Sequence, residues 1–339
     1  MLAPLHSENP TAGPLVSMIV LSYNHSRFIL ETLESVKAQV YKNTELIIVD
    51  DCSTDDSVAV IDRWLQENRI ECTFIRHDKN QGICKSLNDA LAVATGKYIS
   101  MIASDDAWLP DKIEHQVEIM ESQPDDVAVL YSDAFQIDEG GRPLPGLIIA
   151  TYWGSRLPET PQGQVLDTLL QGNFIPGLTT LVRRSCYEKV GLYDENLPWE
   201  DWDMWMRIAR RYSFLYSPTP SVKYRVYEKS FSHSDPARLA RGSFNIGLKQ
   251  FRLGGLTEHQ RSTLTGTLLN FARELYSRND PDASNILLAL WQVTGNKRAS
   301  WMYRLSRLGI PFRTLQRANA GRLRLRNFFG KLVGNDQAA

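Results

Sequence analysis

Hydrophobic and polar positions alternate along the first part of the chain in blocks that predict strands and helices in turn. Four short apolar runs, rich in residues that favour β-structure, predict buried strands at residues 16–21, 45–49, 72–75 and 98–102. Between them, apolar residues recur at helical spacing, as at Ile29, Leu33, Val36 and Val40. This rhythm, from residue 16 to about residue 132, predicts an α/β fold with a parallel sheet covered by helices on both faces.

The second half of the chain is less regular. Residues 139–163 hold several glycines and prolines, which predicts a long loop or flap. Short strands are expected at 178–182 and 222–227, and a helix is expected to begin near Glu200. From about residue 237 onward the pattern is helical. The expected organisation is a disordered tail at 1–14, a folded domain at 15–236 and a helical region at 237–339.

Polar or acidic residues follow three of the four predicted strands. In open α/β sheets the ligand lies at the carboxyl ends of the strands, so these three ends are expected to converge. They are Ser22-Tyr23-Asn24, Asp50-Asp51 and Ser104-Asp105-Asp106.

The Asp105-Asp106 pair has the chemistry of a metal site. Two adjacent carboxylates repel each other unless a cation or hydrogen bonds offset their charge. A hard divalent ion such as Mg²⁺ or Mn²⁺ takes oxygen ligands from one or two carboxylates and from phosphates. The alternative is a solvated turn that caps the helix expected near Pro110. The position of the pair, beside two other polar strand ends, favours the metal site.

The Asp50-Asp51 pair also has two interpretations. Its carboxylates could accept hydrogen bonds from a nucleotide base or ribose, as acidic residues do in dinucleotide folds. Alternatively, they only complement the dipole of the next helix, which Ser53 is expected to cap.

Glu200-Asp201 opens an amphipathic helix, where a carboxylate is ordinarily just stabilising. The functional alternative is a general base, because an attacking hydroxyl must lose a proton. Arg225, on a late strand, could hold a diphosphate with two parallel hydrogen bonds. His233 lies in a serine-rich stretch, where a histidine is more often simply exposed.

Composition and missing motifs narrow the class of protein. The 339 residues include 43% hydrophobic residues and carry a formal net charge of −1, so the chain as a whole is not a polyanion binder. Four cysteines without CxxC spacing indicate reduced thiols in a cytoplasmic protein. Neither GxGxxG nor GxxxxGK[ST] occurs, which argues against a classical NAD fold and a P-loop ATPase. No signal peptide and no apolar run of about 18 residues is found, so the expectation is a soluble or peripheral protein.

The C-terminal region departs from this average charge. Residues 283–335 contain no Asp or Glu, and ten Lys or Arg lie in 297–331 among aromatic and aliphatic residues. This pattern resembles a helix that lies in a membrane interface. Alternatively, the region packs its apolar face on the rest of the chain or on a second subunit, as in a homodimer. Nucleic-acid binding is not expected, because nothing else in the chain supports it.

Taken in order, the motifs resemble those of the family 2 glycosyltransferases over residues 15–232. The family's "VDDGSTD" is matched with Cys52 in place of glycine. The motifs that carry the resemblance are Val16-Ser17-Met18-Ile19-Val20, Val49-Asp50-Asp51-Cys52-Ser53-Thr54-Asp55, Asn80-Gln81-Gly82, Ala94-Thr95-Gly96-Lys97-Tyr98-Ile99, Val190-Gly191-Leu192-Tyr193-Asp194-Glu195 and Glu200-Asp201-Trp202-Asp203-Met204-Trp205.

The resemblance implies a GT-A fold, a single Rossmann-like nucleotide-binding domain with a mixed central sheet, followed here by the helical region. It implies inverting transfer from a nucleotide-diphosphate sugar to a hydroxyl of a glycan or polyprenol-linked acceptor, in the synthesis of cell-surface polysaccharides or glycoconjugates. The Gln-x-x-Arg-Trp motif of processive synthases is missing, so non-processive transfer is expected. Such an enzyme would work in the cytoplasm or peripherally on the inner membrane face, with residues 297–331 as the contact.

Carried over by position, the resemblance also implies roles for individual residues. The nucleotide would be bound by Ser22, Tyr23, Asn24, Asp50, Asp51, Gly82, Lys85 and Asp105. A Mn²⁺ or Mg²⁺ ion would be bound by Asp106, Asp105 and His233, the diphosphate by Arg225, and Asp201 would be the base with Glu200 beside it. Two departures bear on these roles: Ala103 replaces a frequent Asp, and Tyr227 replaces a frequent His.

Two other functions remain open at this point. A nucleotidyltransferase shares an α/β plan but predicts a glycine-rich loop with a lysine after the first strand, where Ser22-Tyr23-Asn24-His25 stands. A catalytically inert nucleotide-sugar-binding module would keep the fold, although the retained Asp105, Asp106 and Asp201 argue against it. The sugar, the nucleotide and the acceptor are left open by the sequence.

Overall fold

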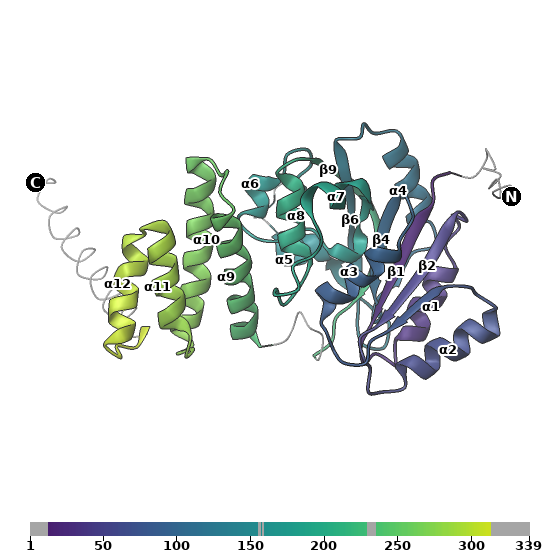
Figure 1. The fold of residues 1–339 in the computed structure, drawn as a ribbon, viewed down its shortest axis with the longest axis horizontal. Coiled ribbons are helices and arrows are strands. Elements are labelled where there is room, and N and C mark those ends of the chain that lie inside the picture. Colours follow the sequence, from purple (N-terminus) through teal and green to yellow (C-terminus); the bar gives the residue numbers. More distant parts are fainter. Residues whose placement is uncertain (1–12, 155–156, 158, 229–234, 313–339) are drawn as a thin grey trace, which may run out of the picture. The chain divides into compact units, whose positions relative to one another are not determined.

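The chain divides into two compact units, Met1–His233 and Ser234–Ala339. The computed structural model describes residues 13–154, 157, 159–228 and 235–312 (Figure 1). Most of the tail expected at 1–14 and the predicted metal ligand His233 therefore lie outside the described residues.

The first unit is built on one mixed sheet. Over the described residues the strands follow the order β3-β2-β1-β4-β8-β6-β9-β5, and β7 pairs with β6. Strands β3, β2, β1 and β4 are parallel, whereas β8 runs antiparallel to both β4 and β6. The α/β fold with a mixed central sheet is thereby confirmed. The strands are β1 Val16–Ser22, β2 Thr44–Asp50, β3 Thr73–Arg76, β4 Tyr98–Ala103, β5 Ala107–Trp108, β6 Val127–Ile137, β7 Pro143–Leu147, β8 Leu181–Arg183 and β9 Ser213–Arg225.

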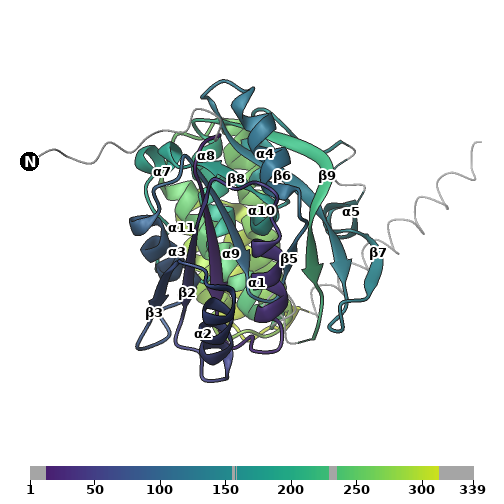
Figure 2. The ribbon, with the colours of Figure 1, turned by 90° about the vertical axis from the view of Figure 1, so that its right-hand side faces the viewer.

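Helices cover both faces of the parallel strands. Alternate residues of a strand point to opposite faces, and Val20 and Ile48 share one buried cluster with side chains of α1 and α2. Helix α3 contacts β1 and β2 outside that cluster, and Figure 2 shows α1 and α3 on either side of these strands. The helices of this unit are α1 Ile29–Lys37, α2 Ser57–Asn68, α3 Ile83–Val93, α4 Lys112–Glu121, α5 Ile148–Tyr152, α6 Leu166–Leu169, α7 Ser185–Val190 and α8 Asp201–Ala209, with a 3₁₀ turn η2 at Gly177–Thr179.

Two expectations from the sequence were wrong in detail. The loop expected at 139–163 contains β7 and α5. Among the described strands β7 pairs with β6 alone, and prolines are tolerated in such an edge strand. Ser53 does not cap a helix. Helix α2 begins at Ser57, and the Ser53 hydroxyl donates instead to the carboxylate of Asp50, 2.7 Å away.

The second unit is helical over its described residues, as the pattern from about residue 237 predicted. Gly247 permits close packing of its first two helices, since a Cβ there would lie 2.9 Å from Leu268 Cδ2. The basic segment expected at 297–331 is described only as far as residue 312. The helices are α9 Pro236–Arg252, α10 Glu258–Ser277, α11 Ala283–Thr294 and α12 Lys297–Arg307.

None of the described helices combines the length and the apolar character needed to cross a bilayer.

Candidate active site

The polar ends of β1, β2 and β4 lie side by side. Strand register pairs Ser22 with Asp50, and the Asp51 amide donates to the Ser22 carbonyl at 2.9 Å. On the other side of β1, the Ser104 amide donates to the Leu21 carbonyl, also at 2.9 Å. The parallel order β2-β1-β4 therefore places both acidic pairs at the same edge of the sheet.

Asp50 is bound within the protein. It is 1% exposed, and its Oδ2 accepts from the hydroxyls of Ser22 and Ser53 at 2.8 and 2.7 Å. Beside it, Oδ1 of Asn24 accepts from the Thr54 amide at 2.7 Å, which joins the turns that follow β1 and β2. Ser22, Asn24 and Asp50 thus hold the strand ends together, whereas Tyr23 is 44% exposed at the same edge.

Asp51 fixes the loop that leads from β3 to α3. Its Oδ1 accepts from the Gln81 amide and contacts His77 Nδ1, both at 2.8 Å, while its Oδ2 accepts from the Gly82 amide at 2.8 Å. Gly82 has a φ of +85°, and a Cβ there would meet no atom within 4 Å. The space beside the Gly82 Cα is therefore open. Lys85, one turn into α3, forms an ion pair with Asp89.

The acidic turn after β4 buries one of its two carboxylates. Asp106 is 4% exposed, and its Oδ1 accepts from the Arg225 amide at 2.8 Å. Burial and the neighbouring Asp105 charge raise the pKa of Asp106 well above its usual value. Among the described residues, the other oxygen of this carboxylate has no hydrogen-bond donor. Asp106 is thus a buried carboxyl group with acceptor capacity to spare, and a cation would be needed to favour its ionised form.

The side chain of Arg225, expected to hold a diphosphate, contacts protein groups instead. Its Nε donates to the Asp105 carbonyl at 2.8 Å, and its Nη1 donates to the carbonyls of Asp138 and Glu139 at 3.2 and 3.1 Å. Its Nη2 pairs with Glu31. The guanidinium is 2% exposed, so in this structure it supports the acidic turn.

Asp105 faces Tyr227, which the sequence marked as a departure from the family pattern, and His25, which it did not mark as a site residue. Tyr227 donates its hydroxyl to Asp105 Oδ2 at 3.2 Å, and His25 Nδ1 lies 3.8 Å from Oδ1. His25 also contacts the Ser104 hydroxyl at 2.9 Å and the Tyr227 hydroxyl at 3.2 Å. Burial raises the pKa of Tyr227, with a further contribution from Asp105, so the phenol remains a donor near neutral pH.

The turn fits a divalent ion only as a partial set of ligands. Over the described residues no group of three or more acidic, histidine or cysteine side chains could enclose a metal. Two adjacent carboxylates with a spare oxygen suit an ion that keeps phosphate oxygens and water as its other ligands, which is typical of Mg²⁺. His233 lies outside the described part of the chain, so its expected role as a metal ligand stays a prediction.

Glu200 and Asp201 stand at the start of α8. Asn173 Nδ2 donates to Asp201 Oδ2 at 2.6 Å, a contact that sequence reasoning missed. A Cβ at Gly177 would lie 2.9 Å from Met101 Cε and 3.8 Å from Glu200 Oε1, so the pair packs close to β4. Burial raises the pKa of Glu200 to about 8, with the Asp201 charge adding to it, and burial raises the pKa of Asp201 to about 6.

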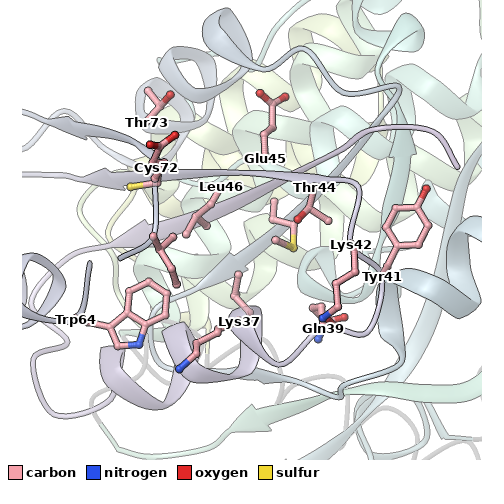
Figure 3. A pocket seen from close by; sticks show the side chains of 14 residues that line it. Lys37, Gln39, Tyr41, Lys42, Thr44, Glu45, Leu46, Trp64, Cys72 and Thr73 are labelled. Atoms are coloured by element: carbon pink, nitrogen blue, oxygen red, sulfur yellow. The ribbon is translucent and has the colours of Figure 1, made fainter. Parts of the chain in front are cut away.

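A separate cavity of 530 Å³ lies away from these residues. It is lined by the first residues of β2 and β3, such as Thr44 and Thr73, and by the last turn of α1, including Lys37. Figure 3 shows it beside Trp64. It therefore opens at the amino ends of the parallel strands, the end opposite the acidic turn.

Comparison with known proteins identifies a family for this arrangement. The family model described as "Glycosyl transferase family 2" matches residues 17–191, slightly more than half of the chain. An uncharacterized glycosyltransferase of Rickettsia typhi is 29% identical over 219 residues, which are 64% of this chain and 66% of that protein. The chain therefore spans less than two thirds of the length of this relative.

Two further relatives have more specific names. TuaG of Bacillus subtilis, named as a candidate teichuronic acid biosynthesis glycosyltransferase, is 28% identical over 65% of this chain and 82% of its own length. WfaP of Escherichia coli, named a UDP-Glc:α-D-GlcNAc-diphosphoundecaprenol β-1,3-glucosyltransferase, is 41% identical over 32% of this chain and 42% of its own length.

Solved structures share the GT-A fold. S. aureus TarS in complex with UDP-GlcNAc superposes with a TM-score of 0.62 at 19% identity, covering 87% of this chain and 88% of that one. The mannosyltransferase PcManGT of Pyrobaculum calidifontis, in complex with GDP-Man and Mn²⁺, gives a TM-score of 0.60 at 20% identity, covering 92% and 85%. The implied GT-A fold is confirmed.

The support that Arg225 gives to the acidic turn leads to a prediction about stability. Arg225→Met removes a buried cation from several partners and leaves the Asp106 charge less compensated, so the free energy of unfolding should fall by about 3–5 kcal/mol. Urea unfolding measures the change.

Arg27→Met is the matched control. The guanidiniums of Arg27 and Arg225 lie 4.8 and 4.7 Å from the centroid of the same Phe28 ring, but Arg27 is 65% exposed and pairs with Glu139 at the surface. Its substitution should cost less than about 1 kcal/mol. Equal effects of the two substitutions would refute the supporting role of Arg225.

Proposed function

The chain belongs to glycosyl transferase family 2, and on this premise we propose that it transfers a sugar from a nucleotide-diphosphate sugar to a hydroxyl of a glycan or polyprenol-linked acceptor. Transfer is inverting and places one sugar per encounter. The observation that carries the proposal is the convergence of Asp51 and the Asp105-Asp106 turn at one sheet edge. The names of TuaG and WfaP support a role in the synthesis of cell-surface polysaccharide.

In this proposal the nucleotide lies over the ends of β1 and β2. Tyr23 offers an exposed ring, and Asp51 keeps one acceptor site beyond its three contacts with His77 Nδ1 and the amides of Gln81 and Gly82, since a carboxylate has about four. The open space at Gly82 admits the base and ribose to Asp51. Ser22, Asn24 and Asp50 act indirectly by holding these turns, and Lys85 contributes positive charge at the start of α3.

Asp106, with Asp105, would hold the Mn²⁺ or Mg²⁺ ion. The ion, when bound, would offset the charge that develops on the departing diphosphate. The chain's own contribution is to fix the two carboxylates. The Arg225 amide donates to the Asp106 carboxylate and its Nε donates to the Asp105 carbonyl, while Tyr227 and His25 orient Asp105. Arg225 is therefore proposed as a positioning residue for the diphosphate site.

Asp201 is proposed as the general base that takes the proton of the acceptor hydroxyl. Environments that separate the pKa values of paired carboxyl groups assign their roles. Burial raises the pKa of both carboxyl groups and each charge opposes the other, so near neutral pH the pair carries one negative charge, which the hydrogen bonds to Asp201 favour on that residue. Asn173 holds Oδ2 of Asp201, and the Trp202 amide holds its Oδ1 at 2.6 Å.

Loss of the base should remove turnover but leave donor binding intact. Asp201→Asn is isosteric and cannot accept the proton, so kcat should fall by roughly 10²–10⁴. Asp125→Asn, at a wholly exposed side chain, is the control and should leave kcat unchanged. The assay uses UDP-, GDP- and dTDP-sugars with Mn²⁺, and thermal shift measures donor binding. Wild-type protein that neither binds nor hydrolyses any of these donors would refute the proposed function.

The raised pKa of Asp201 gives the rate a pH dependence of defined sign. The base must be ionised, so kcat/KM should fall as pH decreases through about 6. Asn173→Ala removes a hydrogen bond that favours the ionised form, so the Asp201 pKa should rise and the acid limb should move to higher pH. Rates measured at saturating donor give the pH dependence of kcat, and rates measured at limiting donor give that of kcat/KM. An acid limb at the same pH in both proteins contradicts the assignment.

Peripheral contact with a membrane is part of the proposal. Helix α12 exposes Trp301 (51%), and Leu308 just beyond it is 74% exposed. They stand among exposed cations of the same segment, and no acidic residue occurs in residues 283–335. Apolar side chains within a basic helix fit the surface of an anionic bilayer. The cations are Lys297, Arg298, Arg304 and Arg307.

This surface predicts binding to vesicles that contain anionic lipid. Wild-type protein should co-sediment with phosphatidylglycerol vesicles and release at high salt, since the attraction is screened. Leu308→Ser should weaken binding, whereas Leu253→Ser, at a leucine 55% exposed at the end of α9, should not. Equal binding of both variants would contradict the assignment to α12. A loss of dimers in Leu308→Ser would assign the face to a second copy.

A further inference from the structure

His77 lies between two carboxylates at the edge of the proposed nucleotide site. Its amide donates to the Asp50 carbonyl at 3.0 Å, which fixes the residue directly after β3. Its side chain is 5% exposed. Nδ1 lies 2.8 Å from Asp51 Oδ1, and Nε2 lies 3.0 Å from Asp89 Oδ2. Each ring nitrogen therefore faces one carboxylate oxygen at hydrogen-bond distance.

The two contacts can be compared with the donors that each form of the ring offers. A neutral imidazole has one N–H donor and one nitrogen lone pair, whereas the cation has two donors. A carboxylate oxygen at 3 Å repels a lone pair, so a neutral ring satisfies only one of the two contacts. Both contacts are satisfied when both nitrogens of His77 carry a proton. The ring is then a buried cation between two anions.

The contacts extend into a row of four charges. Asp89 also pairs with Lys85, so the order is Asp51, His77, Asp89 and Lys85. The row joins the end of β2, the loop after β3 and the first turns of α3. Two negative and two positive charges alternate along it, which offsets the cost of burying Asp51 and His77. The ionisable groups that face the ring are Asp51 and Asp89, with Lys85 behind Asp89.

We propose that protonated His77 is the positioning residue for Asp51, and that it links nucleotide binding to pH. The proposal rests on the proposed function, in which Asp51 accepts a hydrogen bond from the nucleotide. The His77 cation holds Oδ1 of Asp51, which leaves an acceptor site on Oδ2 beside the open space at Gly82. When the ring loses a proton, one of its carboxylate contacts is lost and Asp51 is less firmly held.

UDP is the probe for the binding arm, titrated calorimetrically with Mn²⁺ from about pH 6.5 to about pH 9. His77→Asn keeps one donor but no charge, so UDP should bind roughly tenfold more weakly at the lower pH. Wild-type affinity should fall toward that of the variant as pH rises, whereas the variant should show no such fall. In Asp89→Asn the affinity for UDP should begin to fall at a lower pH than in wild type, because the His77 cation loses one stabilising anion.

Asp62→Asn is the matched control. Asp62 pairs with Arg76, the neighbour of His77 in sequence, at a side chain 39% exposed. The Asp62→Asn variant should bind UDP within about twofold of wild type, with the same pH profile, because exposed ion pairs contribute little. A purely structural role for His77 would lower affinity at every pH and would not move the pH profile in Asp89→Asn. That result would overturn the proposal.

A spectroscopic arm is independent of nucleotide binding. The ¹⁵N shifts of His77, assigned by comparison with His77→Asn, should show two protonated ring nitrogens in the ligand-free protein at about pH 6.5. A neutral ring there overturns the proposal. If wild type binds neither UDP nor GDP, the proposed nucleotide site fails, and the ¹⁵N shifts still decide the charge of the row. If the protein binds UDP but the His77 ring is neutral, or the pH profile of UDP affinity is unshifted in Asp89→Asn, the proposed role of His77 alone has failed.

Discussion

The buried guanidinium of Arg225 is the contact on which the acidic turn depends. Arg225 ends β9, yet its backbone and side chain reach β4's terminal turn, α1 and the segment after β6. A buried cation costs free energy unless it is fully paired, and every nitrogen of this side chain has a protein partner. The same contacts that satisfy Arg225 therefore fix the turn before any ligand arrives, which is what preorganisation requires.

The buried carboxylates of the site differ in their surroundings. Asp50 accepts three hydrogen bonds, from the Ser22 hydroxyl of β1 and from the hydroxyl and amide of Ser53, so its contacts join the strand ends. Asp51 and Asp106 each keep acceptor capacity that no described donor uses, and Asp51 adjoins open space at Gly82. An unused acceptor on a buried carboxylate is costly, so such atoms mark where a ligand donor or cation would be stabilised. Asp50 and Asp51 have three contacts each, so the open space at Gly82, and not the number of unused acceptors, marks Asp51 as the proposed ligand contact.

The sequence predicted the part of this site that follows from strand order. Apolar runs located four strands, and the carboxyl-end rule located Asp51 and Asp106. The same rule applies to His77, which follows β3, but the polar residues after the strand predicted at 72–75 were not counted among the converging strand ends. Arg225 was expected to bind a diphosphate. The protein groups that occupy its side chain lie 86 to 194 residues away in sequence, and a local pattern does not show such contacts. Asn173 lies in an irregular segment and gave no signal.

The proposed roles require opposite protonation states within one site. Asp201 acts as a base only when ionised, while Glu200 beside it is protonated near neutral pH because burial and its neighbour's charge raise its pKa. His77 holds both of its partners only when it carries its second proton. Acid therefore removes the base, and alkali removes the support of Asp51, so the two requirements overlap in a limited interval near neutrality. Because the two groups act at different steps, the acid limit belongs to turnover and the alkaline limit to nucleotide affinity.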